Sequence, residues 1–334
     1  MLDYHGKSYA TIESSSLKRM SNVAPTAALI IAMAALCAGQ TPSWTAPRRP
    51  DGQPDLQGIW NTTTITPLER PKEFAQKQIL TADEAAAYEQ RVVSRRDAEP
   101  DGPDSVADPA VWWERGTKVV STRRTSLVVD PPDGRVPSLT AEAQKRMQDS
   151  RAETRRHPAD GPQDRSLQER CLLSNGTGPP MLPGPYNNDY QIVQTPGYVM
   201  ILIEMIHDVR IIPLDGRPHL AQDVRLWMGD SRAHWEGESL VVDTTNFTDK
   251  THYRGSDQNL RLVERFTRTG PETILYQFTV DDPTAFTKPW TAEIPMQATV
   301  GPIYEFACHE GNRAMENMLR NARAEERQAE EAAK

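Results

Sequence analysis

The sequence predicts a mainly β protein: an antiparallel meander that closes into a barrel or a strongly curved sheet, with peripheral helices. Short runs of β-branched and aromatic residues recur along the chain and are separated by turn signals such as Pro-Asp-Gly, a pattern typical of antiparallel sheets and barrels. The 334 residues include 27 prolines and 19 glycines, a balance that favours extended stretches and fixed turns over helical repeats.

The boundaries of the elements follow from the same signals. β-branched and apolar runs predict strands at residues 61–66, 125–130, 190–195, 198–212, 238–243, 260–267, 273–280 and 303–308. The capping-box pattern Thr81-Ala-Asp-Glu84 predicts a helix over 82–95, and helix-forming composition predicts two more, at 140–156 and 313–334. We therefore expect a single β-rich domain over residues 40–312, with helical insertions near 82–95 and 140–156, followed by a C-terminal helix.

An apolar segment near the N-terminus indicates export. Ala24 to Gly39 carries no charge, follows Lys18 and Arg19, and is shorter than the ~20 residues that a membrane-spanning helix needs. We expect residues 1–39 to be a cleaved signal, with Met20 as an alternative start, and the mature protein to be periplasmic or secreted without a stable membrane span. An uncleaved anchor is the alternative.

Composition narrows the classes of partner. Charged residues make up 25% of the chain and hydrophobic residues 37%, as in soluble globular proteins. The net charge of −8 lacks the basic excess that binding to a phosphate backbone requires, so nucleic acid is not expected as a partner. Export also argues against chemistry that depends on ATP or NAD, so we expect a small-molecule ligand or substrate and no cofactor.

Two cysteines, Cys171 and Cys308, remain after the predicted signal is removed. In an oxidising compartment they are able to form one disulfide across a long loop, worth about 4 kcal/mol in the chain-entropy model. A pair of buried thiols that never meet and a metal site are the alternatives.

The first candidate site is the run Ile201 to Ile212, interpreted as part of one long strand. Alternation then places Glu204, Asp208 and Arg210 on one face and His207 on the other. A carboxylate enclosed in so apolar a run must be paired or line a wet cavity. The groups are therefore either a structural ion pair, or an acid or base whose pKa is set by burial and by Arg210.

The second candidate is Gly229 to Gly237, interpreted as a loop at the mouth of the barrel, where polar groups meet a ligand. It carries Asp230 and His234 as candidate catalytic groups, with Arg232 and Trp235 as substrate contacts. The alternative is a plain turn in which Asp230 bonds backbone amides and Trp235 packs.

Two further segments offer ligand contacts. Tyr186, Asn188 and Tyr190 supply hydroxyl and amide groups in a stretch framed by prolines, and His309 lies in the Cys308-His-Glu-Gly-Asn312 corner. Because zinc takes histidine and carboxylate ligands together, His309 and Glu310 with His207 or His234 are an alternative zinc site. No metal-binding spacing supports it, so no metal is predicted.

With these segments in view, the chain resembles a widespread family of exported bacterial proteins without a characterised activity. The resemblance rests on phrases similar to Pro54–Trp60, Arg124–Asp130, Glu204–Asp208, His234–Gly237 and Cys308–Asn312. It implies export and a single folded unit, and it assigns no catalytic residue. Gly58-Ile59-Trp60 is also similar to the Gly-x-Trp that opens the first strand of lipocalins, which implies a lipocalin-like barrel with the tryptophan at one end.

These observations lead to one hypothesis and two alternatives. The hypothesis is an exported enzyme with a barrel-like pocket that performs acid–base chemistry, such as hydration, isomerisation, cyclisation or hydrolysis, on a small, partly apolar molecule. The first alternative is a ligand-binding or carrier protein with the same pocket and no turnover. The second is a structural protein of the cell envelope.

Overall fold

The computed structural model describes residues 44–98, 114–174 and 178–334. The chain divides after Thr45, and every described helix and strand lies in the unit Ala46–Lys334. The export segment predicted at 1–39 therefore lies outside the described residues.

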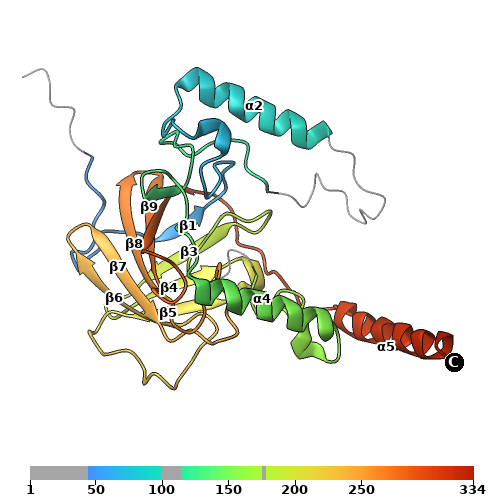
Figure 1. The fold of residues 1–334 in the computed structure, drawn as a ribbon. Coiled ribbons are helices and arrows are strands. Elements are labelled where there is room, and N and C mark those ends of the chain that lie inside the picture. The colour runs from blue at the N-terminus through green and yellow to red at the C-terminus, as the bar shows by residue number, and fades with distance from the viewer. Residues whose placement is uncertain (1–43, 99–113, 175–177) are drawn as a thin grey trace, which may run out of the picture. The chain divides into compact units, whose positions relative to one another are not determined.

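In the described part of the chain, ten strands form one antiparallel sheet, which is a meander nearly closed into a barrel (Figure 1). They are β1 (Gly58–Asn61), β2 (Val128–Asp130), β3 (Asp189–Gln194), β4 (Tyr198–Ile203), β5 (Val209–Pro213), β6 (Asp230–Glu236), β7 (Ser239–Thr245), β8 (Arg261–Gly270), β9 (Thr273–Asp281) and β10 (Trp290–Ala298). Their order is β5-β4-β3-β1-β10-β9-β8-β7-β6, and β2 pairs with β10 beside this path. The predicted fold class is confirmed.

Strand β1 joins two runs of neighbouring strands into one sheet. β3 to β5 form the first run and β6 to β10 the second, and β1 pairs antiparallel with both β3 and β10. Trp60 lies opposite Tyr190 on one side and Ala298 on the other. Its side chain is 1% exposed, and its indole N–H donates to the Leu56 carbonyl at 2.9 Å.

Period-two alternation fills the interior. In β8 to β10 every second residue is buried, which places Phe266, Tyr276, Phe278 and Trp290 in one aromatic cluster with ring centroids 5.0 to 5.7 Å apart between neighbours. A small barrel is filled by its own side chains, so the core occupies the space between the strands. A ligand cavity is therefore to be sought among the loops.

The helices occupy the ranges where the sequence predicts them. They are α2 (Ala82–Ala98), α4 (Ala141–Arg156) and α5 (Ala314–Ala332), with short 3-10 turns η1 (Lys72–Phe74), η2 (Pro162–Asp164) and η3 (Met205–His207). The capping box of α2 is present: Thr81 Oγ1 accepts from the Glu84 N–H at 3.2 Å, and Glu84 Oε2 accepts from the Thr81 N–H at 2.8 Å.

The predicted long strand at 198–212 is wrong, because the structure folds it into the hairpin β4–η3–β5. Ile206 and His207 adopt φ angles of 67° and 49°, which β-branched and bulky residues seldom do. The turn contains no glycine or proline, so the sequence offers no signal for it. Arg210 consequently points into the barrel opposite Ile201, while Glu204 and His207 belong to the turn and share no strand face with Arg210.

Three other boundaries differ from the prediction. Residues 230–236 form strand β6 instead of a loop, and the first strand ends at Asn61, where it was predicted to begin. Residues 303–308 form no strand. Strand β10 was missed because it contains Pro295. Pro295 lies between the part of β10 that pairs with β2 and the part that pairs with β1. At this position only β9 pairs with β10, so no backbone N–H is needed on the other side of the strand.

A buried ion pair bridges the gap between the edge strands. β5 and β6 come into contact but share no ladder among the described residues. Arg210 of β5 forms a bidentate pair with Glu264 of β8, with Nη1 3.0 Å from Oε1, and the two side chains are 2% and 0% exposed. Arg210 Nη2 also donates to Ser231 of β6 at 3.2 Å and to Thr244 of β7 at 3.5 Å. One guanidinium thus connects four strands.

Removing one partner of this pair is expected to leave a buried charge without compensation. Glu264→Gln should lower the free energy of unfolding by about 3–5 kcal/mol in urea titrations. Arg265→Gln is the matched control, since its exposed pair with Glu236 is worth less than about 1 kcal/mol. The double variant Arg210→Met/Glu264→Leu should be less destabilised than Glu264→Gln because no charge remains. Equal losses for Glu264→Gln and Arg265→Gln would contradict this account.

Candidate ligand-binding cavity

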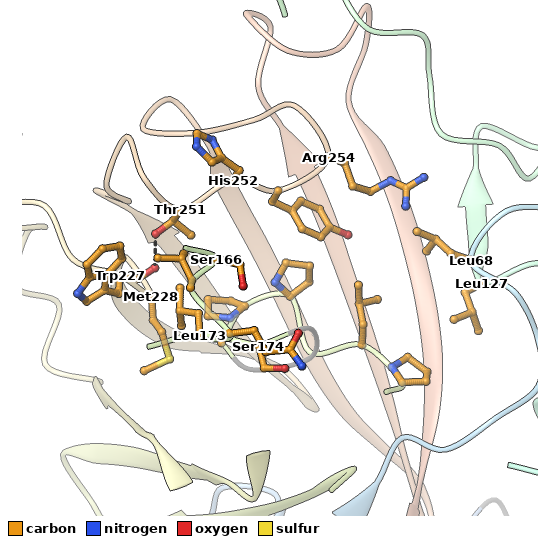
Figure 2. Close-up of a pocket in the computed structure, with 18 of the residues that line it drawn as sticks. Leu68, Leu127, Ser166, Leu173, Ser174, Trp227, Met228, Thr251, His252 and Arg254 are labelled. Atoms are coloured by element: carbon orange, nitrogen blue, oxygen red, sulfur yellow. Dashed lines mark hydrogen bonds between the residues drawn. The ribbon is translucent and has the colours of Figure 1, made fainter. Parts of the chain in front are cut away.

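A cavity with a volume of about 730 Å³ lies among loops (Figure 2). It is lined by Thr64–Leu68, Leu127, Ser166–Gln168, Leu173–Ser174, Gly178–Pro180, Leu182–Pro183, Trp227–Met228 and Thr251–Arg254. Figure 2 shows Trp227 and Met228 on one side and Leu68 and Leu127 on the other. Most of these side chains are apolar, as is usual in small-molecule sites.

One wall is a proline-rich segment tied to the barrel interior. Gly178 begins it with a φ of +71°, and a Cβ at this position would lie 2.9 Å from Met228, so glycine is needed for both the turn and the close approach. The Met181 N–H donates to Tyr276 Oη at 3.0 Å, and Tyr276 in turn donates to Glu264 at 2.8 Å. This wall of the cavity is therefore hydrogen-bonded to the buried ion pair.

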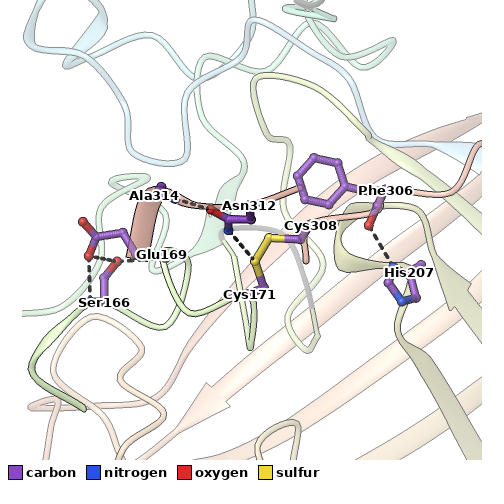
Figure 3. Close-up of a disulfide and its surroundings, with 8 residues drawn as sticks. All are labelled: Ser166, Glu169, Cys171, His207, Phe306, Cys308, Asn312 and Ala314. Carbon is purple, nitrogen blue, oxygen red and sulfur yellow. Dashed lines mark hydrogen bonds between the residues drawn. A yellow bond between two sulfur atoms is a disulfide. The ribbon is translucent and has the colours of Figure 1, made fainter. Parts of the chain in front are cut away.

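A disulfide holds a second wall. Cys171 and Cys308 are bonded, with Cα atoms 5.7 Å apart, which confirms the predicted pair (Figure 3). Cys171 belongs to the segment whose residues Ser166–Gln168 and Leu173 line the cavity. Asn312 Nδ2 lies 3.4 Å from the Cys171 sulfur, so the residues just before α5 also contact this wall.

Two hydrogen bonds hold residues that line the remaining side of the cavity. Thr251 Oγ1 donates to the Trp227 carbonyl at 2.9 Å (Figure 2), and Arg254 pairs with Glu69 at 2.6 Å. The Tyr253 hydroxyl is buried and has no hydrogen-bond partner among the described residues. A buried polar group left unpaired costs about 1–3 kcal/mol. Burial raises the pKa of Tyr253, so this hydroxyl stays protonated.

The predicted catalytic residues do not line this cavity. Arg210 is in the buried pair with Glu264. The Asp230 carboxylate accepts from His219 Nδ1 at 3.0 Å and from the Leu220 N–H at 3.0 Å, and it also pairs with Arg232. Asp230 thus orients a histidine that lines a second, smaller hollow of about 530 Å³. Exposed His234 pairs with Glu236 at 2.9 Å on the outer surface.

The other predicted catalytic residues lie around the β4–β5 turn. Glu204 is 4% exposed and accepts from the Asp189 N–H at 3.2 Å. Burial raises the pKa of Glu204, and the nearby carboxylates of Asp189 and Glu114 raise it further. Asp208 accepts from the N–H of the next residue, and exposed His207 contacts the Phe306 carbonyl at 2.8 Å (Figure 3).

The predicted substrate contacts are dispersed in the same way. The Tyr186 ring packs near Phe306 at a centroid distance of 6.1 Å, and Asn188 Oδ1 accepts from the Gly184 N–H at 2.6 Å. Tyr190 lies inside the barrel, where burial raises its pKa, and Trp235 packs against the core. His309 is exposed. None of these side chains lines the cavity of Figure 2.

Neither a metal centre nor a membrane helix is found in the described part of the chain. Within residues 44–98, 114–174 and 178–334, no group of three or more His, Cys, Asp and Glu side chains is placed to hold a metal ion. His207, His234, His309 and Glu310 therefore gain no geometric support as zinc ligands. No helix in these ranges is long and apolar enough to cross a membrane.

The residues that line the cavity were not found from the sequence. The sequence shows a rigid loop at Pro179, Pro180 and Pro183. It also shows a polar interruption before a strand, at His252-Tyr-Arg254. What the sequence lacks is any sign that these segments, which are at least 69 positions apart by their numbers, meet at one place. Glu264 did carry a signal, because alternation with Leu262 and Phe266 turns it inward.

The fold and the cavity together define an antiparallel, barrel-like β protein with a mainly apolar cavity among its loops. Comparison of the chain with protein-family models, curated proteins and solved structures finds no match. The resemblance to exported bacterial proteins and to lipocalins stays a prediction.

The raised pKa of Glu204 predicts a pH-dependent effect on stability. Because its folded-state pKa lies above the ordinary value, ionising this side chain opposes folding as the pH rises above that value. Glu204→Gln should match the wild-type free energy of unfolding at pH 4 and exceed it at pH 7.5, measured by urea unfolding. Exposed Glu305→Gln is the control, and its stability relative to the wild type should be the same at both pH values. A variant less stable than the wild type at pH 7.5 would argue against the burial penalty.

The disulfide predicts a second, independent loss of stability. Cys171 and Cys308 are 137 positions apart, so the bond removes considerable freedom from the unfolded chain. The double variant Cys171→Ala/Cys308→Ala should unfold with a free energy about 4 kcal/mol lower, measured in urea without reductant. Adding reductant to the wild type should approach the same value and leave the variant unchanged. A reductant effect on the variant would show that the loss has another source.

Proposed function

We propose that this protein binds a small, mainly apolar molecule in the cavity of Figure 2, outside the cytoplasm. The observation that carries the proposal is the cavity itself: about 730 Å³, within the ~300–1,000 Å³ of small-molecule sites, and lined by leucine, proline, tryptophan and methionine side chains. Removing apolar ligand surface from water there supplies the affinity, at about 25 cal/mol per Å².

Binding without turnover is favoured over acid–base catalysis. The catalytic hypothesis requires Glu204, Arg210 and Asp230 to share a cavity with the substrate. Arg210 is instead paired with Glu264, and Asp230 with His219 and Arg232, and neither Arg210 nor Asp230 lies on the cavity wall. These groups act as structural supports in the proposal, and the lining residues act as the binding surface.

The disulfide supports the location. Disulfides persist in oxidising compartments such as the periplasm and the extracellular space, and Cys171–Cys308 holds a wall of the proposed site. We therefore infer a periplasmic or secreted carrier or binding protein.

The test is the binding of a neutral apolar probe. N-phenyl-1-naphthylamine should bind the mature protein with an increase in fluorescence. Leu173→Trp, which fills part of the cavity, should weaken binding at least tenfold, or about 1.4 kcal/mol. Leu172→Trp is the matched control, because the adjacent residue is equally half-buried and does not line the cavity. Absence of binding, or equal loss in both variants, would refute the proposed function.

A further inference from the structure

The hollow of about 530 Å³ beside Asp230 differs in chemistry from the cavity of Figure 2, and the two share no residue. Three segments form it: the loop between β5 and β6, the end of β7, and the turn that leads into β8. Its lining contains four side-chain amides, one histidine and two arginines, and no carboxylate. A hollow with this lining suits a polar ligand, and it lies within the ~300–1,000 Å³ of small-molecule sites.

Side chains of β6 and the residue after β7 hold the loop that forms one wall of the hollow. Asn246 Nδ2 donates to the carbonyls of Ala221 at 2.9 Å and Val224 at 3.0 Å. Arg232 Nε donates to the Pro218 carbonyl at 3.1 Å. The wall is therefore attached to the barrel at both ends before any ligand binds.

His219 presents a hydrogen-bond acceptor in this wall. Asp230 accepts from His219 Nδ1 at 3.0 Å, from the Leu220 N–H at 3.0 Å and from Arg232 Nη1. A carboxyl group that accepts three donors acts as a carboxylate, so the proton of the neutral imidazole lies on Nδ1 and the lone pair on Nε2.

The free edge of this ring is the accessible one. The Asp230 side chain is 7% exposed and that of His219 is 27% exposed. Because Nδ1 faces the buried carboxylate, the ring exposes the edge that carries Nε2, and this nitrogen has no hydrogen-bond partner in the described part of the chain. A ligand hydroxyl is the group that a neutral Nε2 accepts from.

Arg225 supplies a positive charge that no carboxylate of the described residues pairs with. Its Nη1 donates to the backbone carbonyl of Gln258 at 2.8 Å, which holds the guanidinium without neutralising it. The other arginine of the lining, Arg261, is already paired with Asp243 at 2.8 Å. Arg225 is thus the cation that remains available to an anionic ligand, and its remaining N–H groups suit the two oxygens of a carboxylate.

We propose that this hollow binds a hydroxylated organic acid of the size of a sugar acid. A ligand hydroxyl donates to His219 Nε2, and the ligand carboxylate pairs with Arg225. The side-chain amides of Gln222, Gln258 and Asn259 provide donors and acceptors for further hydroxyls. Asp230 is a positioning residue, since it acts on the ligand only through His219. This second site goes beyond the proposed function and does not rest on it.

Three probes that differ in one group at a time test this inference by isothermal titration calorimetry at pH 7.5. D-glucuronate carries both hydroxyls and a carboxylate, D-glucose lacks the carboxylate, and cyclohexanecarboxylate lacks the hydroxyls. The mature protein should bind D-glucuronate at least tenfold more tightly than either of the other two. Equal affinity for D-glucuronate and one of these analogues, or no binding of D-glucuronate, would overturn the inference.

Two variants assign the contacts. Arg225→Gln should weaken binding of D-glucuronate about tenfold, and Arg225→Lys should restore part of the loss because it keeps the charge. His219→Asn should also weaken it about tenfold, since asparagine can still donate to Asp230 but has nothing in place of Nε2. Arg217→Gln is the matched control, because this arginine lies in the same loop, is paired with Asp215 and does not line the hollow.

The two sites are distinguished by their separate probes. Arg225→Gln and His219→Asn should bind N-phenyl-1-naphthylamine like the wild type, which also shows that they are folded, and Leu173→Trp should bind D-glucuronate like the wild type. Unchanged affinity of Arg225→Gln for D-glucuronate, or a loss in Arg217→Gln equal to that in Arg225→Gln, would overturn the second site. Neither result would affect the proposed function, which depends on N-phenyl-1-naphthylamine and Leu173→Trp.

Discussion

The Arg210–Glu264 pair is the constraint on which the barrel depends. Two opposite charges buried this completely are tolerable only when each satisfies the other, so β5 and β8 are held at a fixed separation across the interior. Ser231 and Thr244 bring β6 and β7 to the same guanidinium. A sheet whose edge strands share no ladder among the described residues is thus closed by side chains, and its last opening is filled by a polar network.

The same network reaches the proposed binding site. Tyr276 donates to Glu264 and accepts from the Met181 N–H, and Met181 lies within the proline-rich wall of the cavity. That wall has few internal backbone donors because of its prolines, so this contact to the barrel is important for its position. The site is therefore supported by rigid elements on one side, and on the other by a cross-linked segment around Cys171.

Sequence reasoning predicted what local patterns control. Alternation and turn residues gave the antiparallel class, and the Thr81–Glu84 capping box gave the start of α2. It failed where tertiary contacts override local preference. Ile206 and His207 take left-handed angles without any glycine, and Pro295 sits inside β10. The cavity was beyond reach for a different reason: its walls come from distant segments, and only the folded barrel decides which loops become neighbours.

The position of the disulfide determines when this wall of the cavity becomes cross-linked. The bond joins a cavity wall to a residue 137 positions later, just before α5, so it forms only after the chain has been made as far as Cys308. If the chain is exported as proposed, the disulfide forms only after translocation, when an oxidant reaches both thiols. This disulfide would then begin to hold the wall around Cys171 only outside the cytoplasm.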